Sequence, residues 1–264
     1  MTKSWQYHNG PLKPNLDHLI RKVDRGFFNI LLIFGATRSG KSTLAFQLGD
    51  YLARNVGVEF TEKEVFFDAG ALERECSKGK KNAVFMLDEA AFDLTGEDWA
   101  KDAQKRLKTY FSVAAKYNQT FILIIPHIEE LRKYFIINEH TRGIEVYYNR
   151  ETLARGRCKL YSRDDLRRIY YLRKMNHYGA AGLVWGFKNT FPKTIPPGID
   201  MVKYEAAKDA AIKSQQQEED TSNTKKALIW RCLDAGLESS VIVKIVNTSL
   251  DYVSRCRREQ KALT

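Results

Sequence analysis

One nine-residue stretch constrains this chain more than any other part of its sequence. Residues 35–43 read Gly-Ala-Thr-Arg-Ser-Gly-Lys-Ser-Thr, which fits the pattern G-x-x-x-x-G-K-S. An apolar run at 27–34 precedes the stretch, and a helical pattern at 43–53 follows it. A strand, a glycine-containing loop and a helix are the context in which this pattern forms a phosphate-binding loop. The sequence therefore predicts a nucleotide site at this point.

Each residue type in the loop has a physical role. Gly35 and Gly40 allow positive φ values, so several backbone N–H groups can converge on one phosphate, and the helix N-terminus adds its positive dipole end. Lys41 can reach the β- and γ-phosphates, and the Ser42 hydroxyl can coordinate Mg²⁺. We therefore expect ATP and Mg²⁺ as cofactors, held by the loop residues Gly35, Ala36, Thr37, Arg38, Ser39, Gly40, Lys41, Ser42 and Thr43.

A second candidate motif is the pair of acidic residues that ends the apolar run at 82–87. A continuous apolar run is typical of a buried parallel strand, and ligands of open α/β sheets collect at the carboxyl ends of such strands. Asp88 is suited to hold the metal, as the aspartate of a Walker B motif does. Glu89 is suited to orient or deprotonate an attacking water, which hydrolysis of a phosphoanhydride also requires.

Further apolar runs at 64–68, 121–126 and 144–149 predict three more strands, and Trp99–Tyr117 shows the clearest helical periodicity. Strands that alternate with helices predict an α/β fold with a parallel sheet flanked by helices and right-handed crossovers. In the hydrolytic branch of phosphate-loop proteins, one extra strand lies between the two motif strands, and residues 121–126 can supply it. His127 directly follows that run, which suits either a γ-phosphate sensor or an ordinary loop histidine.

The composition favours a polyanionic partner. The formal net charge is +11, and basic proteins tend to meet nucleic acid, acidic membranes or phosphorylated ligands. The four cysteines are scattered, so neither a zinc site nor a disulfide framework is indicated. The N-terminus lacks the apolar core of a signal peptide and no apolar run is long enough to cross a bilayer, so we expect a cytoplasmic protein without a membrane segment.

A basic region follows the last of these strands. Residues 150–174 contain nine basic and three acidic side chains, with tyrosines interleaved. We predict hairpin strands at 157–161 and 168–174, with DNA contacts from Arg155, Arg157 and Lys159, because arginine pairs with phosphate and tyrosine stacks on bases. The alternative is a sheet edge that its charges protect from aggregation.

The last third of the chain predicts an extended arm at 187–201 with three prolines, a helix at 203–213 and a disordered linker at 215–226. Three short helical patterns follow, at 227–233, 239–246 and from about residue 250 to Arg258. This outline is typical of a helix-turn-helix, with Arg255, Arg257 and Arg258 as DNA contacts. The alternative is a helical tail for oligomerisation or for a protein partner. The predicted domains are a lead-in at 1–26, an ATPase domain with a basic hairpin at 27–202, a helix and linker at 203–226, and a small helical domain at 227–264.

The motifs between Gly35 and Asn149 resemble the additional-strand (RecA-like) P-loop ATPases, and most of all the FtsK–HerA group and the Zot-like and packaging-type ATPases of phages and mobile elements. That resemblance implies an oligomer, commonly a hexamer, in which an arginine of one subunit completes its neighbour's site. Arg142 fits this role best, with Arg132 and Arg106 as alternatives. The strand after the second motif often ends in glutamine in these relatives, whereas here His127 stands in that place.

Three functions are consistent with these motifs. The leading hypothesis is a Mg²⁺-dependent ATPase that moves DNA as an oligomer, encoded by a virus or a mobile element. The second is an ATP-switched DNA-binding protein for replication initiation, partition or transposition targeting. The third is a small-molecule kinase in which the arginines at 150–157 form a lid. A membrane-extrusion ATPase would need a separate membrane partner.

Overall fold

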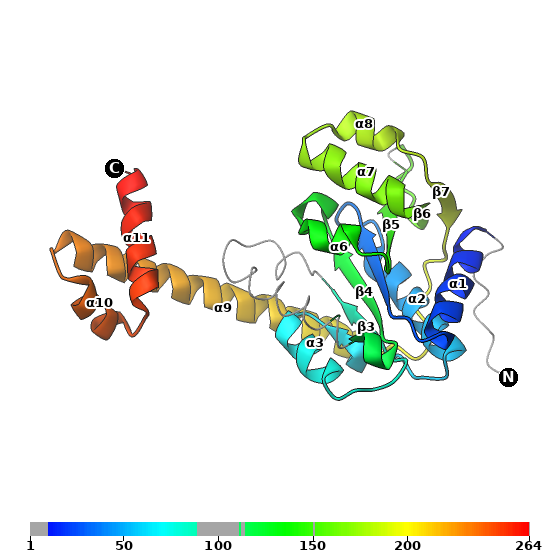
Figure 1. Ribbon diagram of the computed structural model, residues 1–264, viewed down its shortest axis with the longest axis horizontal. Coiled ribbons are helices and arrows are strands. Elements are labelled where there is room, and N and C mark those ends of the chain that lie inside the picture. Colours follow the sequence, from blue (N-terminus) through cyan, green and yellow to red (C-terminus); the bar gives the residue numbers. More distant parts are fainter. Residues whose placement is uncertain (1–9, 89–110, 112–113, 150, 264) are drawn as a thin grey trace. The chain divides into compact units, whose positions relative to one another are not determined.

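The chain divides into two units, Met1–Glu205 and Ala206–Thr264. The computed structural model describes residues 10–88, 111, 114–149 and 151–263 of the chain. A seven-stranded sheet with helices on both faces forms the first unit, and helices form the second (Figure 1).

The sheet has the strand order β2-β3-β4-β1-β5-β6-β7. Neighbouring strands from β2 to β5 are parallel, whereas β6 and β7 are antiparallel to their neighbours. Strand β4 pairs with both β1 and β3, so the extra strand lies between the two motif strands, as the sequence predicts. The predicted α/β fold with a mostly parallel sheet is therefore confirmed. The strands are β1 (Asn29–Phe34), β2 (Val65–Phe66), β3 (Val84–Leu87), β4 (Thr120–Ile125), β5 (Thr141–Tyr147), β6 (Arg157–Tyr161) and β7 (Phe187–Thr190).

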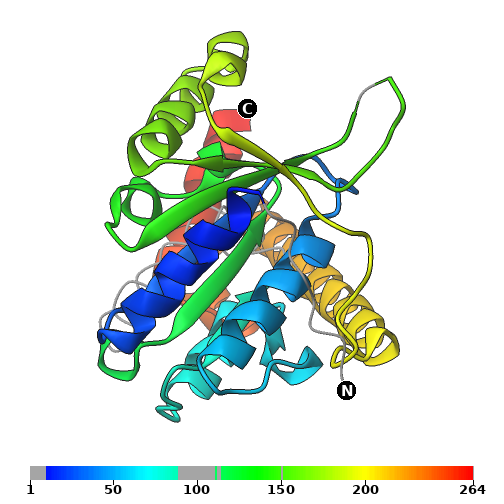
Figure 2. The ribbon, with the colours of Figure 1, turned by 90° about the vertical axis from the view of Figure 1, so that its right-hand side faces the viewer.

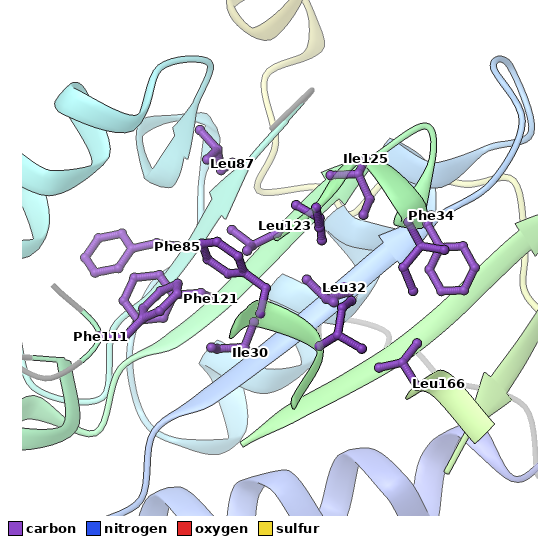
Figure 3. Close-up of a cluster of buried hydrophobic side chains, with 14 of the residues drawn as sticks. Ile30, Leu32, Phe34, Phe85, Leu87, Phe111, Phe121, Leu123, Ile125 and Leu166 are labelled. Atoms are coloured by element: carbon purple, nitrogen blue, oxygen red, sulfur yellow. The ribbon is translucent and has the colours of Figure 1, made fainter. Parts of the chain in front are cut away.

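Both faces of the central strands are buried, because successive side chains of a strand point to opposite faces. Ile30, Leu32 and Phe34 of β1 belong to the hydrophobic cluster on one face, together with Phe85 and Phe121 (Figure 3). Leu31 and Ile33 belong to the cluster on the other face. A strand covered on both faces reads as a continuous apolar run, which is why these strands could be predicted from the sequence.

Helices cover both faces of the sheet. Side chains of α1 (Leu12–Asp24) and α2 (Lys41–Asn55) pack into the second of these clusters, so both helices lie on the same face (Figure 2). Side chains of α3 (Ala69–Cys76), α6 (Lys133–Ile137) and α7 (Arg163–Lys174) pack into the first cluster. Among the described residues, α8 (Tyr178–Leu183) also belongs to this unit.

The predicted second hairpin strand at 168–174 is wrong, because these residues belong to helix α7. The Ser162 hydroxyl accepts a hydrogen bond from the N–H of Asp165 and so caps this helix, and two carboxylates lie in its first turn. Its buried residues Leu166, Ile169 and Tyr170 recur with helical spacing. The strand predicted at 157–161 is correct, and it pairs with β5 as a hairpin.

The expected disordered linker at 215–226 is also wrong, because the backbone there continues helix α9 (Met201–Asp234). This stretch contains neither glycine nor proline, and its many glutamine, glutamate and lysine residues favour a helix. The low apolar content that suggested disorder is equally consistent with a solvated helix. The predicted helix at 99–117 lies mostly outside the described residues, of which 111 and 114–117 are helical.

Three helical segments form the second unit's core. The end of α9, α10 (Ser239–Val246) and α11 (Leu250–Leu263) bury one small cluster of side chains. Its members are Ile229, Cys232, Ile242, Val246, Val253 and Cys256. Gly236 and Asn247, both at positive φ, lie in the two turns. The helices predicted at 239–246 and from about residue 250 are confirmed, whereas residues 227–233 are the end of the long helix α9 and not a separate short helix.

In the parts of the chain that the structure describes, no helix combines the length and the apolar character needed to cross a membrane.

The continuity of α9 can be tested with Gln216→Pro. Proline removes one backbone donor and clashes with the preceding turn, which costs about 3 kcal/mol inside a helix. We expect a weaker helical signal in far-ultraviolet circular dichroism and a locally cleavable backbone, with Gln216→Ala as the matched control that leaves both unchanged. If the proline variant matches the wild type in both measurements, residues 215–226 are not helical in solution.

Candidate nucleotide and metal site

The loop between β1 and α2 has the backbone that its glycines permit. Gly35 and Gly40 lie at φ values of 136° and 104°, and Arg38 also has a positive φ. A Cβ atom on Gly35 would lie 2.0 Å from the backbone oxygen of Val146 on β5. Glycine is therefore required at position 35 both by the backbone conformation and by the close approach of β5.

The loop is fixed to the neighbouring strand. The N–H of Gly35 donates to the backbone oxygen of Pro126, 3.2 Å away, directly after β4. Because β1, β3 and β4 are parallel neighbours, their carboxyl ends meet at one edge of the sheet. This edge carries the predicted loop, Asp88 and His127, so the structure brings the described members of both motifs to the same edge.

Two side chains of the loop lie where a phosphate could engage them. The Lys41 ammonium donates to the backbone oxygens of Gly35 and Ala36, at 2.8 and 3.1 Å. The hydroxyl of Ser39 is buried and has no hydrogen-bond partner among the described residues. Buried hydroxyls are normally hydrogen-bonded, so an absent acceptor at Ser39 fits a ligand such as a phosphate.

The two motifs meet in one hydrogen bond. The Ser42 hydroxyl donates to Oδ2 of Asp88 over 3.2 Å. Asp88 is 1% exposed, and its own N–H donates to the backbone oxygen of Phe66 over 2.8 Å, which fixes its position at the end of β3.

This pair has the chemistry of a Mg²⁺ site. Mg²⁺ prefers oxygen ligands, keeps several waters and uses one or two protein oxygens with substrate phosphates. Within the described ranges, no group of three or more His, Cys, Asp or Glu side chains is arranged to hold a metal ion. The Ser42 hydroxyl and the Asp88 carboxylate are oxygen ligands, so they fit Mg²⁺ at a site where phosphate and water would complete the coordination.

Tyr204 also belongs to this site, although no motif in the sequence predicts it. Its hydroxyl donates to Oδ2 of Asp88, the same oxygen that Ser42 contacts, although the two residues are 116 positions apart. Burial is the main cause that raises the Tyr204 pKa, and the Asp88 carboxylate adds to it, so the phenol is a proton donor. Tyr204 stands among helix-forming residues without a motif, so no sequence signal identified it.

The segment before α9 fixes Tyr204 in place. The Gln47 side-chain amide on α2 donates to the backbone oxygens of Pro192 and Thr194, each at 2.7 Å. Asp200 caps α9 by accepting from the N–H groups of Val202 and Lys203. The Tyr204 ring then packs edge-on against that of Phe46, with centroids 4.9 Å apart.

The other predicted catalytic residues are less well defined by the structure. His127 follows β4 as predicted and is exposed, with Nδ1 3.7 Å from the Glu129 carboxylate. Glu89 and Arg106 lie outside the described residues. The roles of His127 and Glu89 remain predictions.

Arg142 lies at the opposite end of the sheet from this chain's own loop. It is the second residue of β5 and pairs with Leu31, near the start of β1. Its guanidinium donates to the backbone oxygens of Glu139 and Thr141. Burial and, after it, the charge of Arg142 lower the pKa of Lys22 to about 8, so several cationic groups are crowded here. A catalytic role for Arg142 can therefore only be exerted on a neighbouring subunit.

The predicted DNA contacts fall into the two units. Arg155 is exposed in the β5–β6 connection, Arg157 is exposed on β6, and Lys159 donates to the backbone oxygen of Val184 over 3.2 Å. In the second unit, all three arginines lie on α11, with Arg257 and Arg258 exposed and Arg255 5.0 Å from the Tyr252 ring centroid.

The contact between Tyr204 and Asp88 predicts a stability effect. Tyr204→Phe keeps the packed ring but removes a hydrogen bond to a buried carboxylate, which contributes about 1–3 kcal/mol. We expect the free energy of unfolding without nucleotide, from a denaturant titration, to fall by about that amount. Tyr178→Phe is the matched control, because Tyr178 is exposed on α8. Equal stability of the wild type and Tyr204→Phe would contradict the contact.

Comparison with protein-family models gives no match for this chain, and no curated protein matches it. Among solved structures, a FIGL-1 AAA domain in complex with ADP matches with 13% identity and a TM-score of 0.40, over 76% of this chain and 81% of that one. The replication initiator DnaA bound to AMPPCP and single-stranded DNA matches with 13% identity and a TM-score of 0.37, over 97% and 90%. AMPPCP-bound DnaA from Aquifex aeolicus matches with 14% identity and a TM-score of 0.35, over 98% of this chain and 90% of that one. At such TM-scores the likeness carries no conclusion, and function must be inferred from the chain's own residues.

Proposed function

We propose that this chain is a Mg²⁺-dependent ATPase that acts on DNA. The hydrogen bond between Ser42 and Asp88 is the observation that carries the proposal, because it joins the first turn of α2, directly after the loop, to the residue that follows β3. A bound Mg²⁺ there would neutralise charge that develops on the phosphates.

We assign the other steps of binding and hydrolysis to residues of the chain. The loop amides and the α2 N-terminus bind the phosphates, and Lys41 exchanges its contacts with backbone oxygens for contacts with phosphate oxygens. Asp88 holds Ser42 in position for the metal. Glu89 follows Asp88 directly in the chain, and we assign it the orientation or deprotonation of the attacking water.

The strand order supports hydrolysis over phosphate transfer to a small molecule. The position of β4 between β1 and β3 is the arrangement expected of the hydrolytic branch. In addition, of the arginines that a kinase lid would use, Arg155 lies in the β5–β6 connection and Arg157 is already part of strand β6.

DNA is the favoured partner because of the net charge of +11 and the exposed arginines of β6 and α11. We propose an oligomeric motor of the translocase or packaging type, from a virus or mobile element, in which Arg142 acts on the neighbouring subunit's nucleotide. The crowding of Arg142, Lys22 and His140 supports this role, because a phosphate at that surface would relieve their repulsion. Ile245 and Leu250 of the second unit are exposed and offer a surface for a protein partner.

A second function, an ATP-switched DNA-binding protein, is favoured by Tyr204. The same helix that begins beside Asp88 continues to the three-helix core of the second unit. Occupation of the metal site could therefore change the position of α9 without translocation. Slow turnover together with stable assemblies on DNA would support this second function over a motor.

The proposal is tested with two substitutions in an ATP hydrolysis assay with and without double-stranded DNA. We expect Lys41→Ala to abolish nucleotide binding, because the phosphate charge loses its ammonium partner. We expect Glu89→Gln to bind ATP like the wild type but to lose turnover by about 100-fold or more, the range of a general base.

Lys63→Ala is the matched control for Lys41→Ala, since Lys63 is an exposed cation outside the loop. Unchanged hydrolysis by Glu89→Gln would contradict the assigned role of that residue. Unchanged nucleotide binding by Lys41→Ala would contradict the site itself.

A further inference from the structure

Two aromatic side chains are exposed at the edge of the sheet. Trp185 is 62% exposed and Phe187 is 43% exposed, and their ring centroids lie 4.3 Å apart with the planes at 71°. Phe187 begins β7, the edge strand next to β6 (Figure 1). Large aromatic groups that gather on a surface usually mark a binding site, because their exposure to water is unfavourable.

These rings line an open groove of about 470 Å³. Gly186 between them carries no side chain, and Leu183 extends from the same wall. Lys159 and Lys188 line the groove as well, and no acidic side chain is among its described lining residues. The groove is therefore aromatic and cationic.

The two lysines face each other across the ladder. Lys159 on β6 pairs in register with Lys188 on β7. Like charges directly opposite each other on neighbouring strands destabilise a sheet. Lys188 is exposed, and its side chain makes no hydrogen bond or ion pair with any residue that the structure describes. An anion held between the two ammonium groups would remove this repulsion.

We propose that this groove binds single-stranded nucleic acid, with bases stacked on Trp185 and Phe187 and the backbone phosphates on Lys159 and Lys188. Each nucleotide has one flat base and one anionic phosphate. The base can stack on the aromatic rings of the groove, and the phosphate can pair with its lysines. The inference deepens the proposed DNA-dependent function. It adds a site for unpaired strands to the arginines of β6 and α11.

The chemistry selects this occupant over two others. In a duplex the bases are stacked on each other, so their faces cannot contact a tryptophan unless the strands separate. An apolar protein segment would contact Leu183 as well as the two rings, and the two opposed lysines would not contribute to its binding. An acidic protein segment would use the lysines but would not require an aromatic plane.

The test measures binding of the full-length protein to fluorescently labelled oligothymidylate by anisotropy, without ATP. Trp185→Leu keeps the apolar volume but removes the aromatic plane, whereas Trp185→Phe keeps a plane. We expect Trp185→Leu to weaken binding about 5- to 100-fold, the range of base stacking on one side chain, and Trp185→Phe to bind close to the wild type. Lys188→Ala is expected to weaken binding and to reduce its dependence on salt concentration.

Leu183→Ala is the matched control, because Leu183 lines the same groove and is still more exposed than Trp185. The proposal expects its affinity to equal that of the wild type. Oligouridylate in a parallel titration distinguishes DNA from RNA as the source of the strand. Melting temperatures of all variants identify any loss of folding, and Trp185→Phe covers the case in which Trp185→Leu fails to fold.

Three results would overturn the proposal. One is the absence of binding to both oligonucleotides, and another is equal binding by the wild type and Trp185→Leu. The third is an equal loss in Leu183→Ala, Trp185→Leu and Trp185→Phe, which would assign the groove to an apolar protein segment. Because this assay contains no ATP, its result does not depend on the proposed ATPase activity. A failure of the groove proposal and a failure of the proposed ATPase function can therefore be told apart.

Discussion

The site depends on one hydrogen bond, that of the Ser42 hydroxyl with the Asp88 carboxylate. The three strands β1, β4 and β3 are parallel neighbours, which makes this bond possible. Their carboxyl ends then meet at one edge, where the loop after β1 faces the acidic end of β3. The buried apolar faces of the sheet fix this arrangement, so the core and the proposed chemistry depend on the same strand order.

The chain returns to this site from a distant part of the sequence. After β7, the segment that passes α2 is held by the side-chain amide of Gln47, and it leads to the cap of α9 at Asp200. Tyr204 then contributes its hydroxyl to Asp88. In a metal site, a residue that hydrogen-bonds a ligating carboxylate orients that carboxylate, and Tyr204 has this position toward Asp88. Here the contact joins the first turns of α9 to the end of β3.

Much of the fold could be predicted from the sequence where a local pattern corresponds to a physical constraint. The strands covered on both faces, such as β1 and β4, are continuous apolar runs, and the loop has glycines at two of its positive-φ positions. Residues 168–174 were misassigned because interleaved tyrosines and arginines suit a strand as well as the exposed side of a helix. The helix at 215–226 was missed because polar composition alone does not distinguish a disordered chain from a solvated helix.

The site was predictable only in part for a similar reason. Ser42 and Asp88 belong to motifs with fixed local spacing. Tyr204, Trp185 and Phe187 can be recognised as site residues only from the residues that lie near them in the folded structure.

The central claim is most directly tested by measuring ADP affinity by calorimetry, with Mg²⁺ and with a chelator, for the wild type and for Asp88→Asn. The account predicts that removal of Mg²⁺ weakens ADP binding by the wild type and has little effect on Asp88→Asn. The account would be contradicted if the wild type does not bind ADP, or if its ADP affinity is the same with and without Mg²⁺.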